Sequence, residues 1–126
     1  MSLRTPLGRV RGLGTAKDGT DHFWVQRVTA LALVPLSPLF VGLVWSFNGA
    51  DRADVIALMG NPLVSSLFIL FIVAGIYHAK LGVRVVIEDY IHSEGLKLAS
   101  LILVSLLSFG LGTACVVSVL ILAFGG

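Results

Sequence analysis

Three long apolar segments, approximately residues 28–47, 63–87 and 98–124, dominate the pattern of hydrophobic and polar positions along the chain. Each is long enough to cross about 30 Å of hydrocarbon, which takes about 20 helical residues. A segment exposed to lipid must satisfy its backbone polar groups internally, so each is predicted to be a transmembrane α-helix. The pattern therefore predicts an all-α integral membrane protein with three spans, forming a single membrane domain over residues 1–126.

The polar segments between these runs are short. Residues 1–21 mix charges with four glycines and are expected to form an extended tail, with Asp21 capping the first helix. Residues 48–62 are expected to form a loop that contains a short amphipathic stretch over 52–59. Little of the chain is left for chemistry outside the bilayer, so function is expected at the spans, at their edges or in partner subunits.

The first span contains two prolines, and the third contains a regular spacing of small residues. Pro35 and Pro38 remove two backbone donors from the first span and are expected to bend it. The third span has small residues three or four positions apart, which is typical of a close helix–helix seam in lipid. They are Ser105, Ser108, Gly112 and Cys115.

Composition supports the membrane assignment and charge gives an orientation. The chain is 56% hydrophobic and 13% charged, against about 25% charged in a soluble domain. Basic residues gather in the N-terminal tail and around the second loop, whereas the C-terminal end has none. The positive-inside rule then places the N-terminus in the cytoplasm and the C-terminus in the periplasm. Cys115 is a single cysteine, so it has no internal disulfide partner, and the sequence has no C-x-x-C-H motif for covalent haem attachment.

The candidate chemistry lies at the end of the second span. His78 shares a helix face with Gly75 and Gly82, which predicts a surface free of side chains beside a potential metal ligand. Asp89 falls on nearly the same face about 16 Å further along, followed by Tyr90. The residue types leave two interpretations of His78 open: a hydrogen bond to a neighbouring helix, or ligation of a metal.

The other polar residues near these spans also have ordinary structural interpretations. Arg27 is either a snorkelling anchor in the headgroups or a guanidinium that pairs with a buried anion. Arg84 and Glu88 stand four apart and predict an ion pair on the helix surface. The ordinary interpretation of Tyr90 is an aromatic residue at the membrane interface, and that of Asp89 is a residue of the following loop.

The pattern His78-x3-Gly82-x6-Asp89-Tyr90 resembles the signature of the smaller hydrophobic membrane-anchor chain of succinate dehydrogenase, respiratory complex II. The upstream stretch His22-Phe-Trp-Val-Gln-Arg27 is similar to the start of that family's first helix. The three-span layout agrees, so the resemblance covers nearly the whole chain. Arg84 is a departure, because the family often has an uncharged residue such as Gln at this position.

The resemblance implies a role for each of four residues. His78 is implied to be one axial ligand of the iron of haem b, with the second histidine coming from the cytochrome b subunit of the same complex. Tyr90 is implied to donate a hydrogen bond to ubiquinone, with Asp89 in the polar network beside it. Arg27 is implied to meet a haem propionate.

The resemblance also implies the assembly in which the chain works. The chain is expected to be half of a two-subunit anchor bundle that holds the flavoprotein and iron–sulfur subunits to the bacterial inner membrane. The resemblance implies that it is a non-catalytic part of an enzyme that links the tricarboxylic acid cycle to the respiratory chain, and its partners are expected to include membrane lipid but no nucleic acid. Two other classes of function remain open: a purely structural anchor or assembly protein without haem, and a small proton-coupled transporter.

Overall fold

The structure is a computed structural model, which describes residues 5–7 and 16–126. The elements formed by residues 16–126 are all helical, with no strand among them: α2 (Ala16–Ser46), α3 (Arg52–Met59), α4 (Pro62–Tyr90) and α5 (Glu94–Ala123). Three helical stretches are long and apolar enough to cross a membrane: Thr20–Ser46, Pro62–Tyr90 and Glu94–Ala123. The prediction of an all-α, three-span membrane protein is confirmed.

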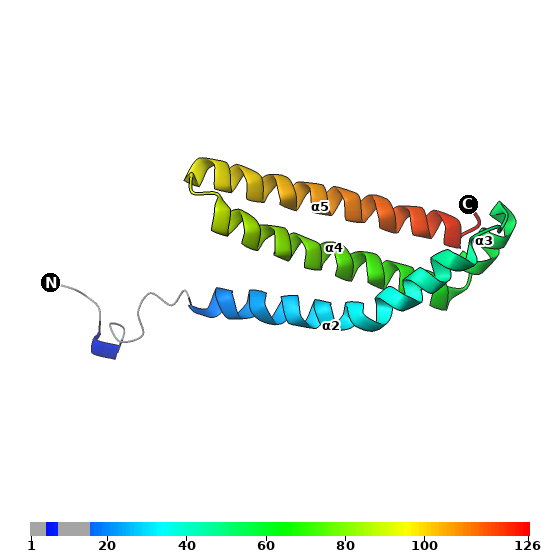
Figure 1. Ribbon diagram of the computed structural model, residues 1–126, viewed down its shortest axis with the longest axis horizontal. Helices are drawn as coiled ribbons and strands as arrows, with labels where there is room; N and C mark the ends of the chain where they lie inside the picture. The colour runs from blue at the N-terminus through cyan, green and yellow to red at the C-terminus, as the bar shows by residue number, and fades with distance from the viewer. Residues whose placement is uncertain (1–4, 8–15) are drawn as a thin grey trace.

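Helix α4 lies in the middle of the bundle. Helices α2 and α5 pack along it, and the short α3 packs on α5 and α4 at one end (Figure 1). The C-terminus lies at the same end as α3, whereas the α4–α5 connection and the start of α2 lie at the other end. Because α2 and α4 run antiparallel, early residues of α2 face late residues of α4.

The start of the first helix corrects the prediction for the tail. Helix α2 begins at Ala16, so residues 16–21 are helical and Asp21 lies inside the helix instead of capping it. The prediction of an extended conformation for residues 1–4 and 8–15 lies outside the described residues. Hydropathy locates only the apolar part of a helix, and polar residues extend α2 beyond it.

Helix α4 also extends beyond the apolar run that predicted it. It has 29 residues and ends at Tyr90, so Asp89 belongs to its last turn and is not a loop residue. A helix of that length is about 44 Å long, against about 30 Å of hydrocarbon in a bilayer. The polar C-terminal end of α4 therefore extends toward the headgroups, whereas His78 lies within the apolar part of the helix.

Side chains cap the starts of α3, which lies within the first loop, and of α4, which follows it. The Asp51 carboxylate accepts a hydrogen bond from the Asp54 backbone N–H at 2.9 Å and starts α3. The Asn61 side-chain oxygen accepts one from the Leu63 backbone N–H at 2.9 Å, and Pro62 occupies the first turn of α4. Both caps satisfy backbone donors that the first turn of a helix leaves free. The stretch over residues 52–59, expected only to be amphipathic, forms the helix α3.

Pro35 and Pro38 lie inside α2 without ending it. Figure 1 shows the helix axis changing direction in its second half, where the colour turns to cyan. The missing backbone donors and the bulk of the rings account for this bend. It carries the end of α2 toward α3, where the chain turns through Gly49 at φ 81°, a backbone conformation that glycine adopts without steric cost.

The best-packed part of the chain lies at the α3 end. A small core forms around Met59, Val64, Phe68 and Val119, and Phe40 of α2 stacks on Phe71 of α4 with ring centroids 4.0 Å apart. Elsewhere the apolar helix faces are largely exposed, and no residue in the most apolar window of the first span is buried. The three helices thus leave much apolar surface for lipid or for other subunits.

The small-residue pattern of α5 is partly explained by its packing on α4. A Cβ placed at Gly112 would meet Ile76 Cδ1 at 3.5 Å, which is ordinary contact, so larger side chains there meet α4. Cys115 is a half-buried free thiol. Gly112 is thus within contact range of α4, but Ser105, Ser108 and Gly112 all line an open groove between α4 and α5, so the predicted close seam is found only in part.

Gly112→Leu is expected to lower the yield and the thermal stability of the detergent-purified protein. The Cβ of the leucine already contacts Ile76, so the longer side chain must displace Ile76 or enter the open space between α4 and α5, and overpacking typically costs about 1–3 kcal/mol. Gly110→Leu is the matched control, because a Cβ at Gly110 meets nothing within 4 Å. Equal yields and melting temperatures for the two variants would contradict a packing role for Gly112.

Candidate functional site

His78 is tied to the first helix by a hydrogen bond. Its Nδ1 lies 3.0 Å from the Thr29 hydroxyl of α2, and the contact is partly buried. Among the described residues no hydrogen bond involves His78 Nε2. The hydrogen bond to a neighbouring helix, expected as one interpretation of His78, therefore exists, and it leaves the second ring nitrogen available.

The helix surface beside His78 has open space. A Cβ at Gly82 would meet nothing within 4 Å, and one at Gly75 would meet only Leu33 Cδ2, at 3.9 Å. The glycines predicted to clear the surface therefore leave room that side chains would fill. No group of three or more His, Cys, Asp or Glu residues able to hold a metal occurs in the described part of the chain. This site offers one nitrogen ligand beside a flat face.

A second polar cluster lies about two to three turns further along α4. Arg84 Nε donates to Glu88 Oε1 at 2.8 Å, which confirms the predicted pair. Arg84 Nη1 also lies 2.8 Å from His22 Nε2 on α2. The side chains of Arg84 and Glu88 are 44% and 43% exposed, and exposed pairs of this kind contribute about 0–1 kcal/mol. The cluster joins the polar ends of two spans.

Arg27 lies on the same helix as Thr29 but makes a different contact. Its guanidinium carbon is 4.9 Å from the centroid of the Phe23 ring, one turn earlier on α2, in a cation–π arrangement. The residue is exposed. Arg27 stands two residues before Thr29, which turns it about 200° around the helix axis, so it does not share the face of α2 that contacts His78.

Asp89 and Tyr90 lie at the end of α4, apart from His78. Both are exposed, and Tyr90 is 78% exposed as the last residue of the helix. The spacing of twelve residues from His78 to Tyr90 corresponds to about 18 Å along the axis. The structure therefore places two separate groups on α4: a histidine within the span and an acid–phenol pair at its edge.

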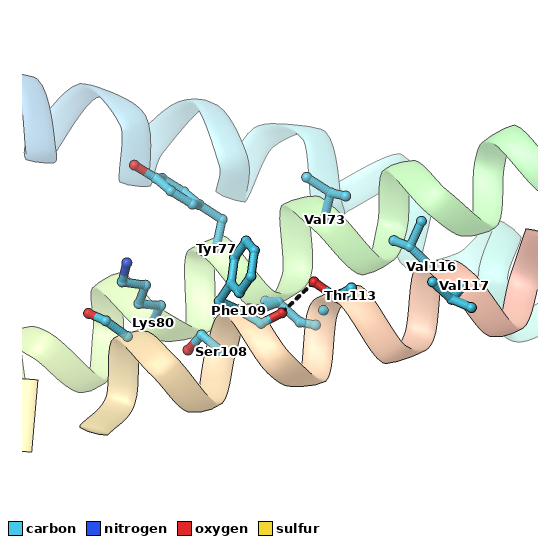
Figure 2. A pocket seen from close by; sticks show the side chains of 11 residues that line it. Val73, Tyr77, Lys80, Ser108, Phe109, Thr113, Val116 and Val117 are labelled. Atoms are coloured by element: carbon cyan, nitrogen blue, oxygen red, sulfur yellow. Dashed lines mark hydrogen bonds between the residues drawn. The ribbon is translucent and has the colours of Figure 1, made fainter. Parts of the chain in front are cut away.

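A groove between α4 and α5 is separate from both groups. Its volume is about 500 Å³, and Tyr77 and Lys80 lie toward one end of it while Val116 and Val117 lie toward the other (Figure 2). Neither His78 nor Tyr90 lines it. An apolar groove of this kind on a membrane protein provides a surface for a lipid chain or another helix.

The fold and the site define the class of protein: a three-span membrane protein with one histidine held inside the bundle and polar groups at one edge. A model of the family described as succinate dehydrogenase/fumarate reductase transmembrane subunit matches residues 1–112. The chain belongs to this family. No solved structure gives a significant match.

Individual relatives agree with the family assignment. The chain is 35% identical over 99 residues to a succinate dehydrogenase hydrophobic membrane anchor subunit of Paracoccus denitrificans, covering 79% of this chain and 77% of the relative. It is 31% identical over 117 residues to the protein of that name in Rickettsia bellii, covering 93% and 94%. It is also 31% identical to a succinate dehydrogenase membrane anchor subunit of Porphyra purpurea, covering 82% and 84%.

Two contacts of the site were missed by sequence reasoning. Thr29 is a polar residue within the first apolar run, and His22 precedes that run. Their partners lie 49 and 62 positions away, on α4. The available signal was the isolated threonine among apolar neighbours, but its partner depends on the register between α2 and α4.

Proposed function

We propose that the chain is the membrane-anchor subunit of a succinate:quinone oxidoreductase and supplies His78 as one axial ligand of haem b. The observation that carries the proposal is the state of His78: Nδ1 is held by Thr29 at 3.0 Å, and Nε2 has no partner among the described residues. A histidine that ligates a metal through one nitrogen usually has its other ring nitrogen hydrogen-bonded in this way.

The surroundings of His78 fit a haem. Open space over Gly82 and loose contact at Gly75 leave room for a flat macrocycle against α4. This chain offers one ligand, so the second histidine comes from the other anchor chain, the cytochrome b subunit. Arg27 is the cation that pairs with a propionate, because its exposed guanidinium is available to groups outside the chain. When bound, the haem supplies one-electron redox chemistry.

The quinone site is proposed at the C-terminal end of α4. Tyr90 donates its phenolic hydrogen to a carbonyl oxygen of ubiquinone, and Asp89 lies beside it in the polar network. Both side chains are exposed in this chain, which leaves them available to line a site completed by other subunits. A phenol is a hydrogen-bond donor at physiological pH.

We infer the orientation in the membrane from the charges at the two ends of the bundle. The α4–α5 connection and the start of α2 share one end (Figure 1), and the positively charged segments gather there. This end faces the cytoplasm, and the C-terminus faces the periplasm of a bacterial inner membrane. The flavoprotein and iron–sulfur subunits then bind on the side where Tyr90 lies.

The experiment that tests the proposal is purification of the tagged chain from its native membrane with its associated subunits. We expect flavoprotein, iron–sulfur and second anchor subunits to co-purify, and a reduced-minus-oxidised difference spectrum with a Soret band typical of b haem. Co-purification of the three subunits without any haem absorption would overturn the ligand role of His78 while leaving the anchor role. Recovery of the chain alone would overturn the anchor role.

A further inference from the structure

The hydroxyl of Thr29 makes three close contacts at once. Its Oγ1 lies 2.8 Å from the Val25 carbonyl oxygen and 3.0 Å from the Gln26 carbonyl oxygen, both in the preceding turn of α2. It also lies 3.0 Å from His78 Nδ1 on α4. A hydroxyl has one proton to donate and two lone pairs that accept. The three contacts therefore restrict which atom carries each proton.

The two carbonyl oxygens accept hydrogen bonds but cannot donate them. If the hydroxyl proton pointed at His78, the Thr29 lone pairs would face two carbonyl oxygens at 2.8 and 3.0 Å with no proton between them, which is repulsive. If the proton points back at the carbonyls, both of those contacts are attractive. The hydroxyl then accepts from His78 Nδ1–H, and all three contacts are satisfied.

We propose that Thr29 is a positioning residue that holds neutral His78 in the Nδ1–H tautomer and presents the Nε2 lone pair to the haem iron. The inference rests on the proposed ligand role of His78. A neutral imidazole has one N–H and one lone pair, so fixing the proton on Nδ1 leaves Nε2 as the nitrogen that can ligate. Hydrogen bonding of the other ring nitrogen also sets the ring orientation and raises the basicity of the ligand.

The geometry around Thr29 makes the acceptor rigid. Threonine is branched at Cβ, and its bond to the preceding turn further restricts χ1. Contacts on both sides of the pair fix the register of α2 on α4: His22 with Arg84 toward the polar end, and Leu33 beside Gly75 toward the interior. The acceptor oxygen is therefore held in place before any haem binds.

The test compares Thr29→Val, Thr29→Ser and Thr113→Val in the assembled, purified complex. Valine keeps the branched shape and deletes the hydroxyl, whereas serine keeps the hydroxyl. Thr113 is the matched control. Its hydroxyl donates to the carbonyl oxygen of Phe109, four residues earlier, at 2.8 Å, as Thr29 does to Val25, but it has no histidine partner. The measurement is the rate of haem transfer to excess apomyoglobin, followed in the Soret band.

We expect haem affinity to fall about 10–100-fold in Thr29→Val, the usual effect of losing a hydrogen bond to a metal-ligating histidine, with correspondingly faster transfer. Thr29→Ser and Thr113→Val should release haem at nearly the wild-type rate. The haem midpoint potential should become more positive in Thr29→Val only, because a less basic imidazole stabilises ferric iron less. If valine prevents assembly, the pair Thr29→Ser and Thr29→Ala gives the same comparison of hydroxyl present and absent.

Haem transfer and a midpoint potential in Thr29→Val equal to those of Thr113→Val would overturn the inference. Equal acceleration in Thr29→Ser and Thr29→Val would also overturn it, because packing and not the hydroxyl would then be responsible. His78→Leu separates this failure from failure of the proposed function. If that variant loses the haem spectrum while Thr29→Val behaves as wild type, only the role of Thr29 is rejected.

Discussion

A complex that carries His78→Leu is expected to lose the low-spin spectrum of a bis-histidine haem. Leucine keeps comparable bulk within the span but has no lone pair, so the proposed haem would lose the ligand that His78 supplies. The described part of the chain has no cluster of ligating side chains that could replace it. The measurement is the absorption spectrum of the purified complex, oxidised and after reduction with dithionite. The spectra are normalised to the flavin content, which measures the amount of complex.

His92→Leu is the control for this substitution. His92 is exposed and lies just beyond the end of α4, so removing its imidazole should leave the haem bands unchanged. Oxidation of succinate with a soluble artificial acceptor should persist in both variants, because that chemistry belongs to other subunits. An unchanged low-spin spectrum in His78→Leu would remove this residue from the ligand role and favour the structural-anchor interpretation.

The helices were predictable from sequence because lipid imposes a strong and simple rule on them. Each apolar run of about 20 residues must become a helix, whatever packs beside it. The ends were less predictable, since polar residues past the run belong to the helix only if local hydrogen bonds or contacts continue it. Helix α2 starts at Ala16, twelve residues before the predicted span at residue 28, and α4 ends at Tyr90 instead of 87.

The site was predictable to the extent that it lies on one helix. The face shared by Gly75, His78 and Gly82 follows from helical periodicity, and the open space at Gly82 agrees with it. The contacts of His78 with Thr29 and of Arg84 with His22 join two helices. They depend on how far α2 slides along α4, and hydropathy does not specify that register.

Exposure along the bundle explains why a chain of this kind needs partner subunits. The buried cluster gathers at the α3 end, around Met59 and Phe68, whereas only Leu81 and Ile87 are buried in the part of α4 that runs from His78 to Tyr90. Side chains that bind cofactors shared between subunits must remain accessible in each chain alone. The loose part of the bundle is therefore the part to which the proposed haem and quinone sites belong.

Tyr90→Phe is expected to reduce quinone reductase activity by about 10–1000-fold. The change keeps the ring and its packing and deletes only the hydroxyl, which we propose donates to a quinone carbonyl. That hydrogen bond strengthens as negative charge builds on the oxygen during reduction, and the loss of one such donor is worth about 1.4–4 kcal/mol of transition-state stabilisation. The measurement is succinate-dependent ubiquinone reduction by the purified complex.

Tyr77→Phe provides the matched control for this last substitution, because Tyr77 is a second tyrosine of α4, 45% exposed, that faces the groove beside Lys80 (Figure 2). Tyr77→Phe also removes a phenolic hydroxyl, but from a position inside α4 and not at its end, so quinone reduction should stay near the wild-type rate. Succinate oxidation with an artificial acceptor should be normal in both variants, since it bypasses the quinone. Equal quinone reductase rates for Tyr90→Phe, Tyr77→Phe and the wild type would show that Tyr90 is an interfacial aromatic and that the quinone donor lies elsewhere.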